Sequence, residues 1–408
     1  SVVNGVLGAV ASALLARSLG VAEFGIFTLV VTMMNLIIDL ADLGMTSTFV
    51  RFGSESVAAG DTTRFQRVLS VILRFKLILG IAIIGIAIVL MKPIAAHVFH
   101  HVDDRIATYF LLSLIPAGLG IAASIYYPIF QSYRNFRLHS VLSMIRFGAK
   151  LLIIVILVFA VGGLSVNLGI WVEIWSVLIF LGLNVFYSPV KVSFQSGDDR
   201  NLRREMLTFT KWLFVYQIIT LASSRLDIFF VGGLANANDL GLYSAASKIT
   251  GLVIAVTNSY YAVLLAEISA QGSREAIERQ KRRAMIGVAL LVVLLPILAI
   301  LAEPIIHRVF GDAYFGAGFI LQIMCVGIAF TVLAYPLNAA LFAYNRSEVF
   351  SMMAVVAAIT IIFGNIYMIP RFGSVGAATV FSLSAFLSWG VASVYYLLRK
   401  RTFQRHTV

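Results

Sequence analysis

The residues of this sequence best suited to chemistry are basic side chains within long apolar segments. Arg146 and Lys150 share one such segment, Arg225 lies in a second and Lys248 in a third. A charge at the centre of a bilayer costs about 2.5–3.5 kcal/mol on insertion scales, so charges at such positions commonly mark a functional site. Guanidinium and ammonium groups bind phosphate oxygens through charge-assisted hydrogen bonds. The pattern therefore predicts a site for a substrate that carries a phosphate or diphosphate group.

Arg146 and Lys150 are four positions apart, which places them on one face of a helix. Like charges at this spacing repel each other. We therefore expect this face to line a wet cavity or to meet anions. We expect Arg225 and Lys248 to lie at other depths in the membrane. The four basic residues would then form a series of cations across it.

Four acidic residues also lie within or at the ends of apolar segments: Asp39, Asp42, Glu173 and Asp227. They could bind a coupling sodium ion, or take up a coupling proton if burial raises a carboxyl pKa. They could equally form structural ion pairs with the basic residues. For Asp39 and Asp42 we favour a cap or an ion pair with Arg17 and Arg51. Arg74 and Lys76 lie near one end of their segment, and we expect them to extend toward the interface.

Signals for other chemistry are weak. His97, His100 and His101 have spacings that a metal site could use, but no cysteine accompanies them and we predict no metal site. We find no P-loop, hydrolase or dinucleotide motif and predict no cofactor. A membrane-embedded glycosyltransferase or acyltransferase would need a catalytic group on a large loop, whereas the longest predicted loops have only about 15–20 residues. The sequence therefore does not predict an enzyme.

The composition explains why charged residues stand out. Of the 408 residues, 60% are hydrophobic and 12% are charged, and the mean hydropathy is +0.95. Ordinary soluble domains have about 25% charged residues. These values exclude a cytosolic enzyme, a nucleic-acid-binding domain and a disordered chain. The sequence predicts an all-α polytopic membrane protein in contact with membrane lipids.

About twelve segments are long and apolar enough to be transmembrane helices, which need about 20 residues each. They are residues 1–16, 24–49, 68–91, 106–131, 138–161, 165–188, 209–234, 240–266, 282–302, 316–343, 347–369 and 373–398. The first is short and begins at Ser1, so we expect the natural N-terminus to be trimmed and the first helix to be truncated.

Basic residues determine the predicted orientation. They concentrate in the connections that follow even-numbered segments and in the C-terminal tail, for example Arg134 with Arg137, Arg203 with Arg204, and Arg401. The positive-inside rule therefore places both termini in the cytoplasm of a protein of the inner, or plasma, membrane. The net charge of +12 is dispersed among these connections, which argues against nucleic acid as a partner.

The chain also contains an internal duplication. Glu23-Phe24-Gly25-Ile26-Phe27 is echoed by Asp239-Leu240-Gly241-Leu242-Tyr243, and Tyr127-Pro128 is echoed by Tyr335-Pro336, with offsets of 208–216 positions. We therefore expect two pseudo-symmetric six-helix lobes, residues 1–200 and 201–408. Six helices per lobe give both lobes the same orientation, so the symmetry axis runs along the membrane normal. Two such lobes around a central cavity predict a transporter.

Several motifs resemble those of one known family. They are Leu15-Ala16-Arg17-Ser18-Leu19-Gly20 with Glu23-Phe24-Gly25, then Asp42-Leu43-Gly44-Met45 with Val50-Arg51-Phe52, and Ser224-Arg225-Leu226-Asp227 with Leu240-Gly241-Leu242-Tyr243. Together they are similar to the Wzx-type polysaccharide flippases, whose substrates include O-antigen and other lipid-linked oligosaccharides. That family belongs to the multidrug/oligosaccharidyl-lipid/polysaccharide exporter superfamily. The resemblance implies a MATE-like fold with two six-helix lobes around a V-shaped cavity.

The resemblance also implies a function. The expected substrate is a polyprenyl-diphosphate-linked oligosaccharide, moved from the cytoplasmic to the outer leaflet by alternating access. Expected partners are a glycan polymerase and a chain-length regulator, with a proton or sodium ion as a possible coupling ion. Arg146, Lys150, Arg225 and Lys248 are the expected substrate-binding residues, and Arg225 and Asp227 lie within a matching motif.

Three other functions stay open at this point. A cation-coupled multidrug or metabolite antiporter would share the architecture but should present acidic and aromatic groups to its substrate. A lipid II flippase would bind the same diphosphate, although such proteins usually have two further helices. A non-transporting partner of a glycan-synthesis complex would tolerate loss of the charges within the membrane.

Overall fold

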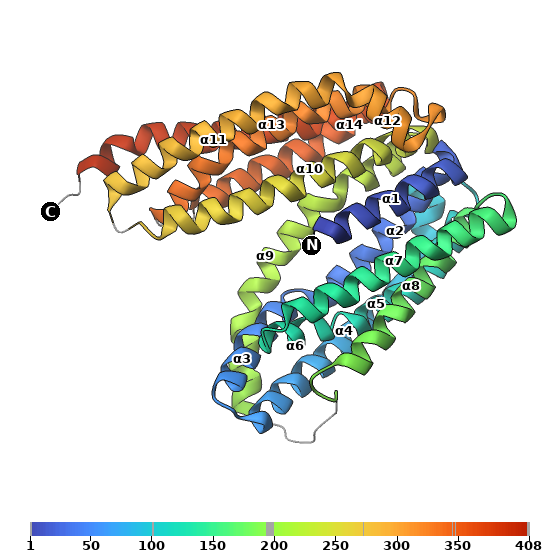
Figure 1. Cartoon of the computed structure of the whole chain (residues 1–408), viewed down its shortest axis with the longest axis horizontal. Helices are drawn as coiled ribbons and strands as arrows, with labels where there is room; N and C mark the ends of the chain where they lie inside the picture. The colour runs from blue at the N-terminus through green and yellow to red at the C-terminus, as the bar shows by residue number, and fades with distance from the viewer. Residues whose placement is uncertain are drawn as a thin grey trace. The chain divides into compact units, whose positions relative to one another are not determined.

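The computed structural model describes residues 2–99, 102–192, 200–271, 273–344, 346 and 348–405, and its regular elements within these ranges are helices (Figure 1). Some side chains within these ranges are not described: those of residues 2, 212, 215, 216, 219, 220, 222–225, 274 and 399–405. Of the three histidines considered for a metal site, His100 and His101 also lie outside the described residues.

The chain forms two compact units. The first consists of Val3–Leu19 and Ile26–Arg225, and the second of Gly20–Gly25 and the chain from Leu226 onward. The helices up to the end of the first unit are α1 (Val2–Leu19), α2 (Val21–Asp42), α3 (Met45–Ala58), α4 (Thr62–Val98), α5 (Ile106–Ala123), α6 (Tyr126–Ser132), α7 (Phe136–Val161), α8 (Val166–Tyr187) and α9 (Arg200–Leu234). Those that follow are α10 (Ala237–Ser269), α11 (Arg274–Ile300), α12 (Ala302–Phe310), the 3-10 helix η1 (Asp312–Tyr314), α13 (Ala317–Ala343) and α14 (Glu348–Arg405).

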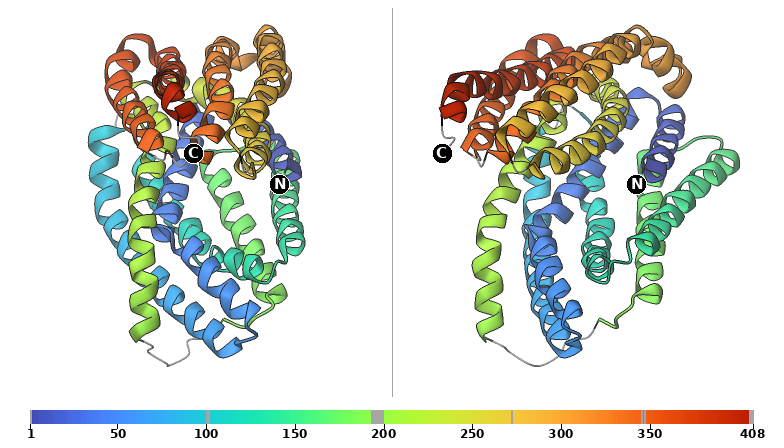
Figure 2. Two further views of the ribbon diagram at one scale, coloured as in Figure 1. Left: turned by 90° about the vertical axis from the view of Figure 1, so that its left-hand side faces the viewer. Right: turned by 60° about the vertical axis from the view of Figure 1, so that its left-hand side comes forward.

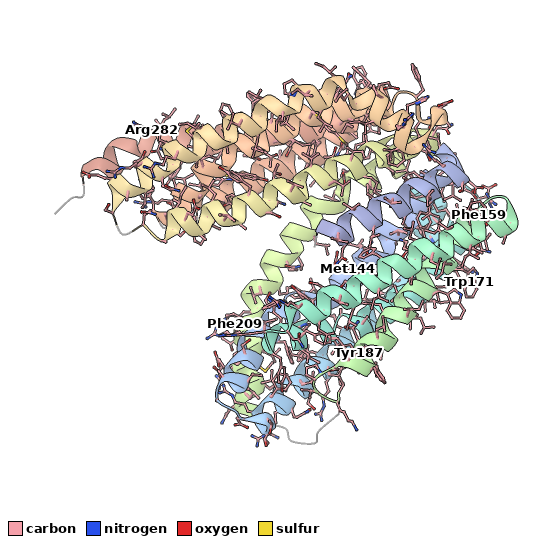
Figure 3. The ribbon with its side chains drawn as sticks, in the orientation of Figure 1. Met144, Phe159, Trp171, Tyr187, Phe209 and Arg282 are labelled. Carbon is pink, nitrogen blue, oxygen red and sulfur yellow. The ribbon has the colours of Figure 1, made fainter. Side chains whose placement is uncertain are left out.

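Nine helical stretches of the described chain are long and apolar enough to cross a membrane, and α1 is a shorter apolar helix. Many large apolar side chains on these helices are exposed, as lipid-facing residues should be. Phe159 is 86% exposed, and it and Trp171 project outward from α7 and α8 (Figure 3). The prediction of an all-α polytopic membrane protein is confirmed.

The predicted segments differ from the helices in two ways. Residues 348–369 of one predicted segment and the whole of segment 373–398 are contained in α14, where the backbone of Gly373 (φ 54°, ψ −136°) makes a kink between them. Segment 24–49 is broken instead, because Leu43 and Gly44 adopt positive φ angles of 34° and 87° and separate α2 from α3. Hydropathy predicts where the apolar segments lie, but it does not predict where the backbone bends.

Several basic stretches predicted as connections are helical. The short helix α3 contains Arg51, and α4, α9 and α11 all begin within basic sequence. Side-chain caps stabilise two of these starts: Asp61 accepts a hydrogen bond from the backbone N–H of Arg64 at 2.8 Å, and Ser273 accepts one from Ala276 at 3.3 Å. Arginine and lysine are good helix formers, so a loss of hydropathy need not end a helix.

The core of the first unit joins α3, α4, α6 and the beginning of α9. The Phe49 and Phe65 rings meet edge to face at 5.5 Å, and Tyr133 adds a second edge contact to Phe65 at 5.2 Å. The buried hydroxyls of Thr48 and Thr210 share a hydrogen bond of 2.8 Å, which ties α9 to α3. Leu202 and Met206 of α9 belong to the same apolar cluster.

In the second unit α13 is the central helix, with α10, α11, α12 and α14 packed around it (Figures 1 and 2). Its small residues Ala339 and Ala340 are fully buried against these neighbours. Tyr335 of α13 stacks on Tyr261 of α10 with ring centroids 4.7 Å apart, and its hydroxyl donates a hydrogen bond to Asn258 at 2.8 Å.

The start of α2 packs into the second unit through two glycines. A Cβ at Gly241 would lie 2.0 Å from the carbonyl oxygen of Val21, and one at Gly25 would lie 2.6 Å from both the carbonyl oxygen of Ala237 and the backbone nitrogen of Gly241. Phe24 fills the adjacent space, with its ring 6.2 Å from Phe310. Gly25 and Gly241 are equivalent positions of the sequence duplication, and only residues without a side chain permit this approach.

We predict that Gly241→Ala destabilises the protein, because the new methyl group overlaps a backbone carbonyl that cannot rotate away. The expected loss is about 1–3 kcal/mol, as for other overpacked sites, and thermal unfolding of the purified protein in detergent measures it. Gly251→Ala on the same helix is the matched control, since a Cβ there meets nothing within 4 Å. Equal melting temperatures for the two variants would contradict the close approach.

Candidate anion-binding site

Helices α7 and α8 form a hairpin that positions the main candidate residues (Figure 1). Gly162 ends α7 in a left-handed conformation with φ 74°, and the Ser165 side chain caps α8 by accepting a hydrogen bond from the backbone of Leu168. The two helices then pack along each other. As a result, the predicted basic face of α7 meets Glu173 and Phe180 of α8.

Lys150 and Glu173 form a hydrogen-bonded ion pair. Both side chains are largely buried, with 14% of the lysine and 5% of the glutamate side chain exposed. Buried charges persist when they are paired, because the partner offsets part of the desolvation cost. Glu173 therefore neutralises one of the two cations on this face of α7.

Arg146 is the second cation of the cluster. Its guanidinium carbon lies 5.2 Å from the centre of the Phe180 ring and 5.7 Å from that of Phe147. Its Nε is buried and finds no hydrogen-bond partner among the described residues, while Glu173 is near enough to attract its charge. The aromatic rings hold the guanidinium plane without using its hydrogen-bond donors.

In the described part of the chain, the cluster therefore consists of the cations Arg146 and Lys150 and the carboxylate of Glu173. Its excess positive charge lies in a largely apolar setting, where electrostatic interactions are stronger than in water. The five N–H donors of a guanidinium are arranged as a fork that matches phosphate oxygens. This arrangement can bind an anion such as a phosphate or diphosphate group.

His139 extends this face of α7 and was not among the predicted residues. Its ring lies 4.8 Å from Tyr127, 5.7 Å from Phe130 and 5.9 Å from Phe180. Its Nδ1 is buried without a hydrogen-bond partner in the described part of the chain. The seven-residue spacing between His139 and Arg146 was the available sequence signal, since it places both on one helix face.

A second charged cluster surrounds Lys76 of α4. The side chain is fully buried, and its ammonium group lies 2.6 Å from Asp42, 3.1 Å from the Ser124 hydroxyl and 3.3 Å from the Thr46 hydroxyl. The prediction that Lys76 extends to the interface is therefore wrong. Its partners come from three other helix ends, so burial with an ion pair replaces exposure to water.

Asp42 also stabilises the break between α2 and α3. Its carboxylate accepts a hydrogen bond from the Thr46 hydroxyl at 2.6 Å and one from the Thr46 backbone at 3.4 Å. The structure pairs Asp42 with Lys76 rather than with Arg51, which lies 3.6 Å from Glu55. Asp39 is half-buried one turn earlier on α2.

The remaining candidates lie on α10 and toward the end of α9. Asp227 accepts a hydrogen bond of 2.7 Å from the hydroxyl of Tyr243, which is fully buried. Lys248 is half-buried on α10, five residues after Tyr243. The side chain of Arg225, another predicted substrate-binding residue, lies outside the described residues.

Sequence reasoning also missed a polar network that joins α11, α13 and α14. Glu278 accepts hydrogen bonds from the hydroxyls of Tyr344, at 2.8 Å, and Tyr396. Lys281 lies 2.7 Å from the same carboxylate and over the Tyr396 ring, and only 10% of its side chain is exposed. No local sequence motif indicates these partners, because Tyr344 and Tyr396 are 66 and 118 positions from Glu278.

The fold is similar to that of two solved membrane proteins. The lipid II flippase MurJ, in an inward-closed conformation, superposes with a TM-score of 0.76 at 15% identity over 97% of this chain and 86% of that one. A MATE family multidrug resistance transporter of the MOP superfamily superposes with a TM-score of 0.77 at 14% identity over 100% and 96%. The chain is a multi-pass membrane protein with the MATE-like fold.

The sequence identifies the family. Residues 14–318 match the family of polysaccharide biosynthesis proteins, and the chain belongs to that family. It is also similar to a probable low-salt glycan biosynthesis flippase, Agl15, from Haloferax volcanii, with 22% identity over 382 residues, 90% of this chain and 75% of the relative. The predicted membership of a family of polysaccharide biosynthesis proteins is confirmed.

We predict that Lys76→Met destabilises the protein by about 1–3 kcal/mol, because the Asp42 carboxylate, which is 20% exposed, loses its counterion. The double variant Lys76→Met/Asp42→Asn should regain most of this loss, since the charge is gone and the single asparagine oxygen can still accept the hydrogen bond from the Thr46 hydroxyl. Thermal unfolding of both variants in detergent measures the effect. A single variant as stable as the unmodified protein would show that the ion pair contributes nothing.

Proposed function

We propose that this chain is a flippase that moves a polyprenyl-diphosphate-linked oligosaccharide from the cytoplasmic to the outer leaflet for surface polysaccharide assembly. The main supporting observation is the excess positive charge of the cluster formed by Arg146, Lys150 and Glu173. Family membership and the similarity to a probable glycan biosynthesis flippase support the same substrate class. The chain acts as a transporter and not as an enzyme.

In this proposal Arg146 binds the diphosphate directly. Its guanidinium is held by Phe147 and Phe180 and retains its donors for the phosphate oxygens. Lys150 contributes a second cation, because a phosphate that approaches it competes with Glu173 for the same ammonium group. Arg225 and Lys248 add positive charge along the route. Neutralising the diphosphate lowers the cost of taking it out of water.

Movement of the substrate follows alternating access. The headgroup enters from the cytoplasmic side, while the polyprenyl tail stays in the bilayer. The two six-helix lobes of this proposal are residues 1–200 and 201–408. Rocking of the lobes about their pseudo-twofold axis then exposes the headgroup to the other side. Both termini lie in the cytoplasm, and a glycan polymerase and a chain-length regulator use the product.

Transport is driven either by a coupling ion that binds the acidic residues or by removal of the product. A proton or sodium ion could act at Asp39, Asp42, Glu173 or Asp227. Glu173 and Asp42 already hold lysines, so uptake of a coupling ion there would release Lys150 or Lys76. Removal of the product by polymerisation would drive transport without any coupling ion.

Two proteins with a similar fold suggest the alternative functions. MurJ is named a lipid II flippase, and the MATE structure is named a multidrug resistance transporter. A lipid II flippase would use the same diphosphate chemistry at Arg146. A multidrug antiporter of cationic compounds would gain nothing from an excess of positive charge at this site.

The experiment is leaflet translocation in proteoliposomes with three substrates: a polyprenyl-diphosphate oligosaccharide, lipid II and a cationic drug. We expect translocation of the first substrate, and Arg146→Ala should reduce its rate by about tenfold or more, because a charge-assisted contact is lost. Arg146→Ala also removes the contacts of the guanidinium with Phe147 and Phe180, so we expect the stability to fall by about 0.5–2 kcal/mol and the protein to stay folded.

Arg137→Ala is the matched control, because it removes an exposed arginine from the beginning of the same helix. It should transport at nearly the normal rate. Preference for lipid II or for the drug would replace the proposed substrate with that one. Equal rates for Arg146→Ala and Arg137→Ala would exclude Arg146 from the transport path.

A further inference from the structure

A basic groove runs along the first turns of α9, in the first unit. One hollow of about 670 Å³ is lined by residues of α3 and α9, including Arg51, Phe52, Arg204, Phe209 and Lys211. A second hollow of about 420 Å³ adds Arg200 and Arg203. Because Arg204, Thr208 and Lys211 line both hollows, the two form one continuous groove.

The groove is strongly positive. Its basic lining residues are Arg51, Arg200, Arg203, Arg204 and Lys211, and its acidic lining residue is Glu205. From Arg200 to Lys211 the helix rises about 16 Å, at about 1.5 Å per residue. Like charges at positions three and four apart on a helix repel each other, and a bound polyanion relieves that repulsion.

The opposite face of α9 keeps the groove in place. Leu202 and Met206 are buried in the apolar core of the unit, and Thr210 is hydrogen-bonded to Thr48 of α3. Leu213 lies so close to Gly44 that a Cβ on the glycine would be 2.8 Å from the leucine Cβ. The basic residues therefore lie on a helix whose position is set by packing.

Aromatic contacts position the arginine on the other wall. The guanidinium carbon of Arg51 lies 4.3 Å from the centre of the Phe209 ring and 5.4 Å from that of Phe52 (Figure 3 labels Phe209). The two rings meet edge to face at 6.1 Å. This arrangement fixes the guanidinium opposite the cations of α9 and gives the groove an apolar floor.

The groove begins where α9 is basic and ends where its apolar sequence begins, near residue 209. It therefore lies at the border between water and membrane, on the side that the distribution of basic residues places in the cytoplasm. A headgroup anchored by a lipid tail reaches this position without leaving the bilayer. Hollows of about 300–1,000 Å³ are typical of small-molecule sites.

We infer that the groove is a docking site for the diphosphate of a polyprenyl diphosphate lipid, occupied on the cytoplasmic side before transport begins. The inference rests on the proposed flippase function and adds a binding site separate from Arg146. Forked guanidinium groups on two walls suit two linked phosphates, whereas an ordinary phospholipid offers one. The groove would then concentrate substrate at the protein before it enters the transport path.

The test is direct binding of polyprenyl diphosphate without a glycan to the full-length protein in phosphatidylcholine nanodiscs, measured by native mass spectrometry. All proteins carry Arg146→Ala, so that binding at that site is removed. Arg204→Gln/Lys211→Gln removes two charges from the groove. The matched control, Arg134→Gln/Arg137→Gln, removes two exposed arginines from the connection between α6 and α7 and the start of α7. We expect about tenfold weaker binding or more for the groove variant and less than about twofold for the control.

Competition identifies the ligand. An equal concentration of phosphatidylglycerol or inorganic pyrophosphate should displace little of the probe. Displacement by phosphatidylglycerol would mean a general surface for anionic lipids, and displacement by pyrophosphate would mean a site for the free anion. Either result, or equal binding by the two double variants, overturns the inference.

Translocation separates this inference from the proposed function. With Arg146 intact, Arg204→Gln/Lys211→Gln should slow transport at low substrate concentration and approach the normal rate at saturation. If the flippase function is wrong, the unmodified protein moves no glycolipid although the groove still binds the probe. If only the docking site is wrong, the groove variant transports normally at every concentration.

Discussion

The energetic cost of charge in an apolar protein is the constraint on which this structure depends. In the first unit Lys76 is fully buried beside Asp42, and Lys150 is largely buried beside Glu173. Removing one member of such a pair leaves a buried charge without compensation, so each pair holds its helices together. Arg146 is added to the second pair, and the cluster at α7 and α8 therefore has more positive than negative charge. This excess positive charge stabilises a bound anionic substrate.

Turns and caps of the backbone set the positions of these charged side chains. The turn at Gly162 and the cap at Ser165 set the α7–α8 hairpin, which places Glu173 beside Lys150 and Phe180 beside Arg146. The break after Asp42 directs its carboxylate toward both Thr46 and Lys76. Irregular backbone in membrane proteins is tolerated where protein groups satisfy it, and here the same carboxylate caps the new helix and neutralises the lysine.

The sequence predicted the transmembrane segments and the shared face of Arg146 and Lys150, because hydropathy and helical periodicity are local properties. It did not predict that Lys76 is buried, since Asp42 is 34 positions away and only the fold brings the two together. Nor did it predict that Gly25 approaches Gly241, although the duplication had marked both glycines. Low hydropathy predicts connections at the basic stretches, yet α3 and the first turns of α9 are helical and line a groove. Partners distant in the chain are thus the part that sequence patterns leave open.

The most direct measurement compares translocation of a polyprenyl-diphosphate oligosaccharide by Arg146→Gln and by Arg146→Gln/Glu173→Gln in proteoliposomes. The single variant leaves one cation facing one carboxylate, so we expect transport to fall about tenfold or more. The double variant removes the carboxylate and leaves Lys150 as an uncompensated cation, so a large part of the rate should return. Normal transport by the single variant would contradict the account. So would a folded double variant that transports no better than the single one.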